Sequence, residues 1–229
     1  NDCKSAGKRI LVRSHNIEHA YYRALARAER NLFQRLFFLQ EAFKLKRYEP
    51  ILGSADHILA ISRPEADYFR QTYGDAHFIP AFHRYDEVSV LQGTGNYILF
   101  HGNLGVAENV EILRHVALPV LADLPYPVIV AGKNPSAWIS RRLMKHKHFR
   151  LVPDPSDQEM EQLIQHAQVN LLLTRHSTGI KLKLLHCLYS GRHCLVNRPM
   201  VAGTGLENLC TVINEPSEMI ITLDSSRNI

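Results

Sequence analysis

Residues 178–191 read Thr-Gly-Ile-Lys-Leu-Lys-Leu-Leu-His-Cys-Leu-Tyr-Ser-Gly, a glycine turn and two lysines at the start of an apolar helical pattern. The apolar runs 169–174 and 194–197 on either side are typical of buried parallel strands. Ligands of open parallel sheets bind outside the carboxyl ends of the strands, and helix N-termini with nearby lysines bind phosphate groups. The segment 178–183 is therefore expected to bind an anionic ligand.

The same alternation of apolar runs and helical patterns continues along the chain and predicts parallel sheets. A long helical stretch is expected from about Glu18 to Tyr48, and Pro64 is expected to begin a helix at its first turn. The polar, glycine-rich residues 90–96 predict a linker, so we expect domains at 1–93 and 94–229. The expected strands are 9–12, 58–61, 77–80, 97–100, 127–130, 149–152, 170–173 and 193–196.

Charge is concentrated in one part of the chain. The net charge is +5, and residues 131–198 contain eleven Lys or Arg against four Asp or Glu, which favours an anionic ligand there. Residues 141–147 contribute four of these basic side chains, and a solvated helix face explains them as well. No basic strand rich in aromatic residues is present, which argues against nucleic acid. No apolar run reaches eighteen residues, and the cysteines show no paired spacing, which together predict a cytoplasmic protein.

Four segments in order resemble a known enzyme family. Besides residues 178–191, they are Arg-Ser-His-Asn-Ile-Glu-His at 13–19, Asp-His-Ile-Leu-Ala-Ile-Ser at 56–62 and Val-Ala-Gly-Lys-Asn-Pro at 130–135. Over about residues 9–215 the chain resembles the retaining GT-B glycosyltransferases of the large family 4 group, which includes bacterial polysaccharide and glycolipid sugar transferases. The resemblance implies an α/β fold of two Rossmann-like domains with parallel sheets, the amino-terminal one incomplete. It also implies a chain truncated at its amino end, with a naturally short protein as the alternative.

The resemblance implies transfer of a sugar from a nucleotide-diphosphate sugar to a hydroxyl of a glycan or lipid-linked acceptor, with retention of configuration. It implies no metal and no other cofactor. Two alternatives stay open. One is a catalytically weak module that binds nucleotide sugars, and the other is a GT-B nucleotide-sugar epimerase, which needs no acceptor.

The donor half departs from the family at two places. Family members carry two glutamates eight positions apart around the glycine turn, where this chain has Thr178 and His186. A threonine and a histidine can hydrogen-bond a sugar, but neither supplies a carboxylate. The segment 100–105 also lacks the basic residues that contact the diphosphate in many relatives. The positive charge is therefore expected from Lys133, Lys181 or Lys183.

The donor-binding candidates follow from these positions. Lys181 and Lys183 are two apart on a helix and do not share a face, so we expect Lys181 to reach the phosphates and Lys183 to be solvated or on the acceptor side. Asn103 follows a strand end and has helix capping as its alternative role. The candidates are Gly102, Asn103, Lys133, Thr178, Gly179, Ile180, Lys181, Lys183 and His186.

His15 is the catalytic candidate outside the donor half. It ends an expected strand, and the corresponding histidine of the family lies close to the transferred sugar, where it would hydrogen-bond a hydroxyl. A surface or core position is the alternative. No metal site is expected, because neither the His146 and His148 pair nor the His15 and His19 pair has a completing cysteine or carboxylate.

The expected helix 18–48 has more apolar surface than one sheet-facing stripe needs. Residues 23–48 also hold seven Lys or Arg against Glu29 and Glu41. Part of this helix is expected to line the acceptor site or to lie peripherally on the anionic inner face of the membrane. The alternative is that a missing amino-terminal portion covers them.

Overall fold

The computed structural model describes residues 2–29, 31–80, 82–175, 182–215 and 218–220. The chain divides into two compact units, the first running to Phe82 and the second beginning at His83. Residues in the expected linker contact the second unit: the Gly95 N–H donates to Gln168 Oε1 (2.6 Å), and Arg192 Nε donates to the Gly93 carbonyl (2.9 Å). The chain therefore joins the second unit before the boundary at 93/94 that the composition indicated.

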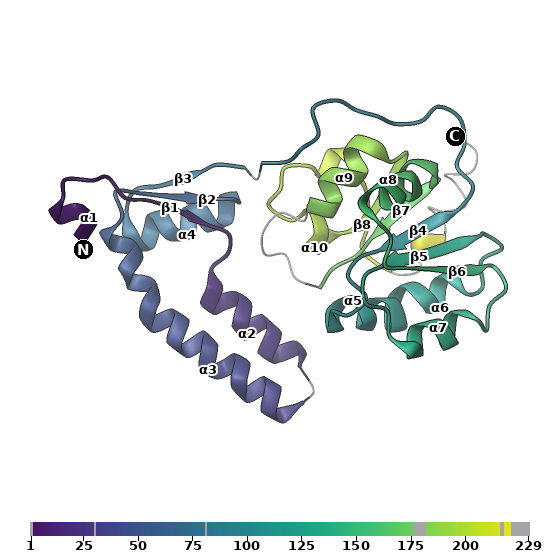
Figure 1. Cartoon of the computed structure of the whole chain (residues 1–229), viewed down its shortest axis with the longest axis horizontal. Helices are drawn as coiled ribbons and strands as arrows, with labels where there is room; N and C mark the ends of the chain where they lie inside the picture. The colour runs from purple at the N-terminus through teal and green to yellow at the C-terminus, as the bar shows by residue number, and fades with distance from the viewer. Residues whose placement is uncertain (1, 30, 81, 176–181, 216–217, 221–229) are drawn as a thin grey trace. The chain divides into compact units, whose positions relative to one another are not determined.

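The first unit is built on a parallel three-stranded sheet with the order β1-β2-β3 (Figure 1). Its core is small: Ile58 and Ala60 of β2 and Ala76 of β3 pack with Ala66 and Phe69 of α4. Its elements are α1 (Asp2–Ser5), β1 (Leu11–Ser14), α2 (Glu18–Ala28), α3 (Leu32–Tyr48), a 3-10 turn (Glu49–Ser54), β2 (His57–Ala60), α4 (Arg63–Tyr73) and β3 (Ala76–Phe78).

The expectation of one helix from Glu18 to Tyr48 is wrong. The stretch forms two helices, α2 and α3, which pack against each other as a hairpin (Figure 1). Asn31 explains the break, because its extended backbone ends the helical path and its Oδ1 accepts hydrogen bonds from Phe33 N (2.9 Å) and Gln34 N (3.3 Å). This side chain satisfies two backbone donors that a helix start otherwise leaves without partners.

The second unit contains a parallel six-stranded sheet in the order β6-β5-β4-β7-β8-β9. Its strands are β4 (Ile98–His101), β5 (Val128–Gly132), β6 (Phe149–Pro153), β7 (Val169–Leu172), β8 (His193–Asn197) and β9 (Thr211–Ile213). Its helices are α5 (Ala107–Ile112), a π-helical turn (Leu113–Ala117), α6 (Leu118–Leu121), α7 (Ala137–Leu143), α8 (Asp157–His166), α9 (Leu182–Ser190), α10 (Arg198–Val201) and a 3-10 turn (Glu207–Leu209).

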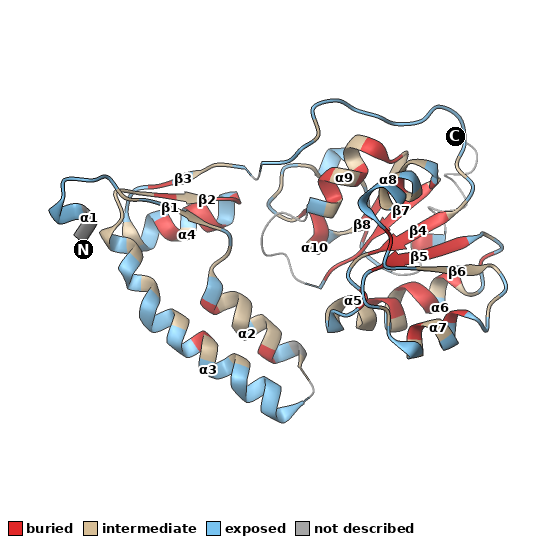
Figure 2. Cartoon of the chain, viewed as in Figure 1, coloured by how far each residue is buried: buried red, intermediate tan, exposed pale blue. Residues whose placement is uncertain are grey.

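Both faces of this sheet are buried (Figure 2). Along β4, Ile98 and Phe100 point into the core beneath α5, α6 and α7, whereas Leu99 points into the core beneath α8, α9 and α10. Because successive side chains of a strand alternate between faces, a strand covered on both sides is apolar throughout. The five strands expected in this half are confirmed to within two residues at each end, and β9 is an additional strand that the sequence analysis missed.

The strand order makes this unit Rossmann-like. Counted from β4, the order is 3-2-1-4-5-6, the arrangement in which consecutive strands add first to one side of the starting strand and then to the other. The direction reverses between β4 and β7. In open sheets of this kind ligands bind outside the carboxyl ends of the strands at that reversal.

Gly132 lets β5 approach the turn after β4 closely at this edge. A Cβ atom at Gly132 would lie 1.7 Å from the Gly102 carbonyl oxygen, a distance that no side chain can accommodate. The Gly102 N–H donates to the Ala131 carbonyl (3.1 Å), and Leu104 N–H donates to the Lys133 carbonyl (2.7 Å). Gly132 is therefore required for the shape of the edge.

We expect Gly132→Ala to lower the free energy of unfolding of the second unit by about 2–3 kcal/mol, the upper part of the range for overpacking. The sole tryptophan, Trp138 of α7, is partly buried against the core of this unit, so its fluorescence during urea unfolding reports the change. Gly102→Ala is the matched control, since its Cβ would meet only the Asn109 side chain, at 3.3 Å. Equal losses in the two variants would contradict the expected role of Gly132.

Candidate functional site

The candidate donor site is the carboxyl edge of the six-stranded sheet at the reversal between β4 and β7. At the end of β4, His101 is buried, and its Nε2 lies 3.3 Å from Cys187 Sγ of α9. Burial, with smaller contributions from the charges of Lys183 and His186, lowers the pKa of His101 to about 3. His101 is therefore neutral at physiological pH and adds no positive charge to the edge.

Gly102 and Asn103 follow His101 in the turn. Asn103 is exposed, and its Oδ1 accepts a hydrogen bond from Gly105 N (3.0 Å). It does not cap α5, whose N-cap position is Val106. The Asn103 side chain thus shapes the turn after β4, and the Gly102 backbone lies at the carboxyl edge of the six-stranded sheet.

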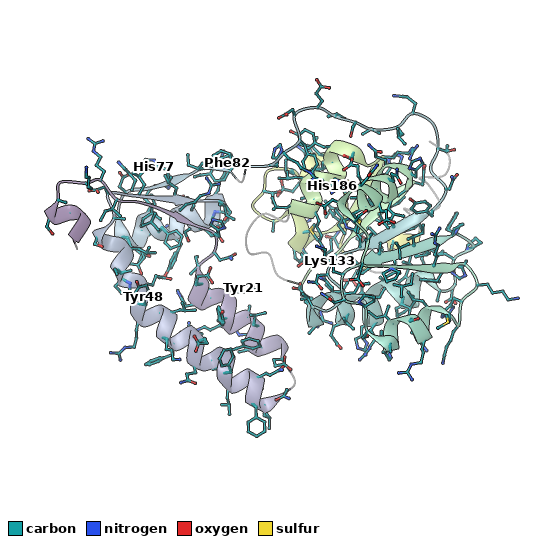
Figure 3. The ribbon with its side chains drawn as sticks, viewed as in Figure 1. Tyr21, Tyr48, His77, Phe82, Lys133 and His186 are labelled. Carbon is teal, nitrogen blue, oxygen red and sulfur yellow. The ribbon has the colours of Figure 1, made fainter. Side chains whose placement is uncertain are left out.

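Lys133 follows β5 and is exposed at the same edge of the sheet (Figure 3). The next residue, Asn134, has a φ of 54°, a left-handed conformation that asparagine tolerates better than most residues. Its N–H donates to Asp154 Oδ1 across a distance of 2.7 Å, which ties the turn after β5 to the turn after β6. The expected contact of Lys133 with an anion stays a prediction.

A glutamate that the sequence analysis missed organises the end of β7. Glu108, in the first turn of α5, accepts hydrogen bonds at Oε1 from Thr174 Oγ1 and Arg175 N, both 2.7 Å long. Asn197, at the end of β8, accepts a hydrogen bond at Oδ1 from the Thr174 N–H and donates one through Nδ2 to the Thr174 carbonyl. The sequence signal for Glu108 was its place at a helix start directly after a glycine turn. These contacts join the ends of β4, β7 and β8 into one polar edge.

Lys183 lies at this edge, near the start of α9. It is half-buried, and its Nζ lies 3.5 Å from the Leu173 carbonyl at the end of β7. The sequence analysis expected a solvated or acceptor-side lysine, but the side chain is turned toward the strand ends. Thr178, Gly179, Ile180 and Lys181 lie outside the described residues, so their placement stays a prediction.

His186 pairs with a carboxylate. On α9 (His186 is labelled in Figure 3), its Nε2 lies 2.5 Å from Glu161 Oε2 of α8. Its ring stacks on Tyr85 with the ring centroids 5.0 Å apart. Burial raises the pKa of Glu161, but hydrogen bonds from Ser190 and His186 outweigh that effect and hold it below the usual range. The sequence analysis missed Glu161 and Tyr85, because neither is close to His186 in the sequence.

His15, the catalytic candidate, belongs to the first unit. It follows β1, is exposed, and lines a cavity of about 350 Å³ together with the strand end and the carboxyl half of α3. The cavity is lined by Val12, Arg13, Ser14, His15, Asn16, Glu18, Leu45, Tyr48, Glu49, Ile51, Leu52 and Phe69. The location at the carboxyl end of a parallel strand is one at which such sheets bind ligands.

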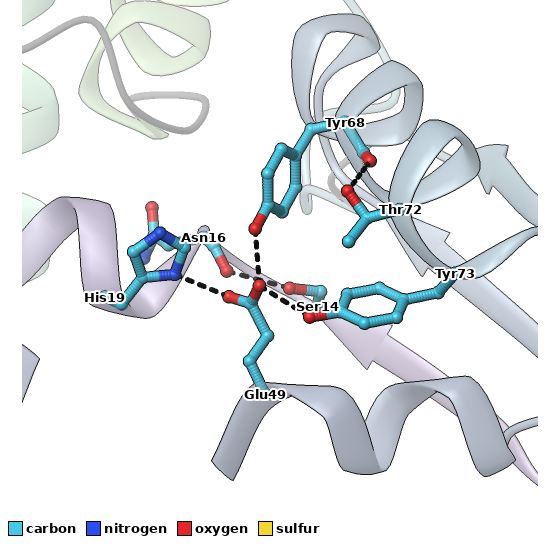
Figure 4. Close-up of polar contacts among 7 residues, drawn as sticks. All are labelled: Ser14, Asn16, His19, Glu49, Tyr68, Thr72 and Tyr73. Carbon is cyan, nitrogen blue, oxygen red and sulfur yellow. Dashed lines mark hydrogen bonds and ion pairs between the residues drawn. The ribbon is translucent and has the colours of Figure 1, made fainter. Parts of the chain in front are cut away.

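Glu49, which lines this cavity, is the centre of a carboxylate network (Figure 4). The Glu49 side chain is only 9% exposed. It accepts hydrogen bonds at Oε1 from the hydroxyls of Tyr68 (2.5 Å) and Tyr73 (2.8 Å), while Oε2 lies 2.7 Å from His19 Nδ1. Burial raises the pKa of Glu49, but these three partners outweigh it and lower the pKa from the ordinary value of 4.5. Burial and the bond to Glu49 raise the pKa of Tyr68 to about 12.

We expect Glu49→Gln to destabilise the first unit by about 1.5–3 kcal/mol at pH 7, because hydrogen bonds to a charged group are lost. The lowered pKa also gives a pH dependence: the stabilisation is complete above pH 4.5 and is lost as the pH falls below that value. Hydrogen exchange of the peptides covering α3 and α4 measures both effects. Glu41→Gln is the matched control, since its contact with Lys44 is a surface ion pair worth less than about 1 kcal/mol. If Glu49→Gln lost stability at low pH to the same extent as the wild type, the pH dependence would come from other groups.

The chain is similar to known proteins in sequence and in structure. No protein-family model matches the chain. In sequence the chain is 26% identical over 231 residues to an uncharacterised 44.6 kDa protein in the cps region of Klebsiella pneumoniae, an alignment that covers 95% of this chain and 57% of that protein. The chain thus spans little more than half the length of that relative.

Solved structures share the fold. The structure of TarM superimposes with a TM-score of 0.63 at 11% identity, covering 81% of this chain and 39% of TarM. The pneumococcal O-GlcNAc transferase GtfA, in complex with UDP and GlcNAc, has a TM-score of 0.53 at 12% identity, covering 67% of this chain and 32% of GtfA. These neighbours are GT-B glycosyltransferases, and the expected GT-B-type α/β fold with parallel sheets is confirmed.

Proposed function

We propose that this chain is the donor-binding part, with a portion of the acceptor side, of a glycosyltransferase that transfers a sugar from a nucleotide-diphosphate sugar to a hydroxyl of a glycan or lipid-linked acceptor. The observation that carries the proposal is the carboxyl edge of a Rossmann-like sheet at the reversal between β4 and β7, where Lys183 Nζ lies 3.5 Å from the Leu173 carbonyl at the end of β7. The cps-region relative from Klebsiella pneumoniae favours a polysaccharide acceptor.

The chemistry of a nucleotide-sugar donor explains why its proposed site needs positively charged residues. Departure of a nucleoside diphosphate develops negative charge, which cations and backbone N–H groups at a helix start stabilise. Lys183 and Lys133 lie at this edge, and Lys181 precedes α9 directly in the sequence. In this proposal these lysines stabilise the negative charge of the leaving diphosphate without a metal. Retention of configuration belongs to the same proposal and follows from the family resemblance.

The pair of His186 and Glu161 is proposed to bind the ribose of the donor. Relatives carry a glutamate at the position of His186, and here Glu161 of α8 brings a carboxylate to within 2.5 Å of the imidazole. A carboxylate accepts hydrogen bonds from both ribose hydroxyls. His186 then orients Glu161, and the pair replaces the single glutamate. His15 is proposed to hydrogen-bond the transferred sugar from the cavity of the first unit.

We expect UDP to bind the chain and Lys181→Ala and Lys183→Ala each to weaken it about 10- to 100-fold, the loss of a charged partner to phosphate. Isothermal titration calorimetry measures this. His186→Ala and Glu161→Gln are expected to weaken UDP but not inorganic pyrophosphate, which has no ribose. Lys145→Ala is the matched control, because Lys145 is exposed and precedes β6, at the amino edge of the same sheet.

The results also separate the proposal from its alternatives. If UDP bound both lysine variants as tightly as the wild type, Lys181 and Lys183 would not belong to the donor site. Equal losses for UDP and pyrophosphate in His186→Ala would make the histidine structural. UDP binding without sugar transfer by the complete protein would favour the module that binds nucleotide sugars, an alternative supported by Thr178 and His186 standing where relatives have glutamates.

Helix α3 is proposed to contact an anionic membrane surface, where a lipid-linked acceptor would lie. Its large apolar side chains are exposed, with Phe33 at 86% and Leu36 at 63%, and basic residues accompany them. Basic helices with exposed aromatic side chains bind acidic lipid interfaces. No helix among the described residues is long and apolar enough to cross a bilayer.

We expect the chain to sediment with vesicles containing anionic lipid at low salt and to be released at high salt, because salt screens surface charge. Phe33→Glu is expected to reduce the bound fraction several-fold. Phe82→Glu is the matched control, since Phe82 is 79% exposed but lies outside α3. Absence of vesicle binding at low salt would point instead to a soluble acceptor or to a covering segment.

A further inference from the structure

Three metal-binding side chains meet at the amino edge of the small sheet in the first unit. His57 is the first residue of β2, Asp75 directly precedes β3, and His77 lies within β3 (Figure 3 labels His77). The parallel register pairs Ile58 with Ala76 and Leu59 with His77, which brings the three residues together on neighbouring strands. Donor-site and catalytic candidates follow the carboxyl ends of strands, so this cluster belongs to neither.

The geometry of the cluster is close to that of a metal site. His57 Nδ1 lies 2.6 Å from Asp75 Oδ2, and His77 Nε2 lies 2.7 Å from Asp75 Oδ1. The donor atoms of all three residues lie within 4.8 Å of one another. Ligands of tetrahedral zinc, at about 2.1 Å from the ion, are about 3.4 Å apart. Small rotations of exposed side chains therefore suffice to place the three donors around one ion.

We propose that His57, Asp75 and His77 bind one Zn²⁺ ion, with water as the fourth ligand. Two imidazole nitrogens and a carboxylate oxygen suit zinc and similar transition metals, whereas Mg²⁺ and Ca²⁺ prefer oxygen ligands throughout. The carboxylate already holds each imidazole by a hydrogen bond.

The ion would stabilise the pairing of the edge strand β3 with β2 in the three-stranded sheet. β3 has only three residues, and β2 is its sole strand partner in the part of the chain that the structure describes. Because the ion joins the two strands where they begin, it stabilises this pairing, and β3 is the last strand before the chain enters the second unit. The role is structural and independent of sugar transfer.

The test is calorimetric titration of Zn²⁺ into the purified chain without an affinity tag. We expect one ion per chain, and His77→Gln and Asp75→Asn each to weaken binding at least tenfold. Both side chains are about half exposed, so neither variant is expected to unfold. His115→Gln is the matched control, since His115 is likewise exposed and pairs with a carboxylate, Glu111, at 3.3 Å, but no metal-binding group of three includes it among the described residues.

A second measurement reads the coordination directly. Co²⁺ bound by the chain is expected to give the intense visible absorption of a four-coordinate ion, and His57→Gln is expected to abolish it. Circular dichroism confirms that each variant is folded. The absence of zinc binding by the wild-type chain, or equal affinities for wild type, His77→Gln and His115→Gln, would overturn the proposal and leave a surface cluster of hydrogen-bonded histidines.

Discussion

Parallel pairing of the strands is the constraint on which the rest of this structure depends. When every strand of a sheet runs in one direction, every carboxyl end emerges at the same edge, and the crossover helices must cover both faces. The six strands of the second unit obey this rule, with Ile98 and Phe100 buried on one face and Leu99 on the other. Polar groups that follow the strands therefore have one common edge at which to gather.

That edge is shaped more by the backbone than by side chains. Gly132 allows β5 to meet the turn after β4, Asn103 folds that turn, and Glu108 draws the end of β7 toward α5. The proposed phosphate ligand would bind at this edge, because backbone N–H groups at a helix start and nearby lysines bind phosphates. The sugar transfer proposed above would need positioning and charge from the protein.

The first unit follows the same rule on a smaller scale. Its three parallel strands have one edge beside His15 and the cavity walled by Glu49, and an opposite edge carrying His57, Asp75 and His77. The small core of this unit explains why polar contacts matter there. Glu49 ties α4 to the turn after α3 through two tyrosines, and a bound ion would tie β3 to β2.

The sequence by itself determined the parallel α/β fold and most strand positions, because apolar runs and glycine turns report local burial and backbone freedom. It also placed Gly102, Lys133 and Lys183 after or beside strand ends. Only the tertiary structure decided that Lys183 turns toward Leu173, that His186 meets Glu161, and that His57, Asp75 and His77 converge. These contacts depend on which helix covers which strand and on strand register, and neither leaves a periodic signal within one segment of the chain.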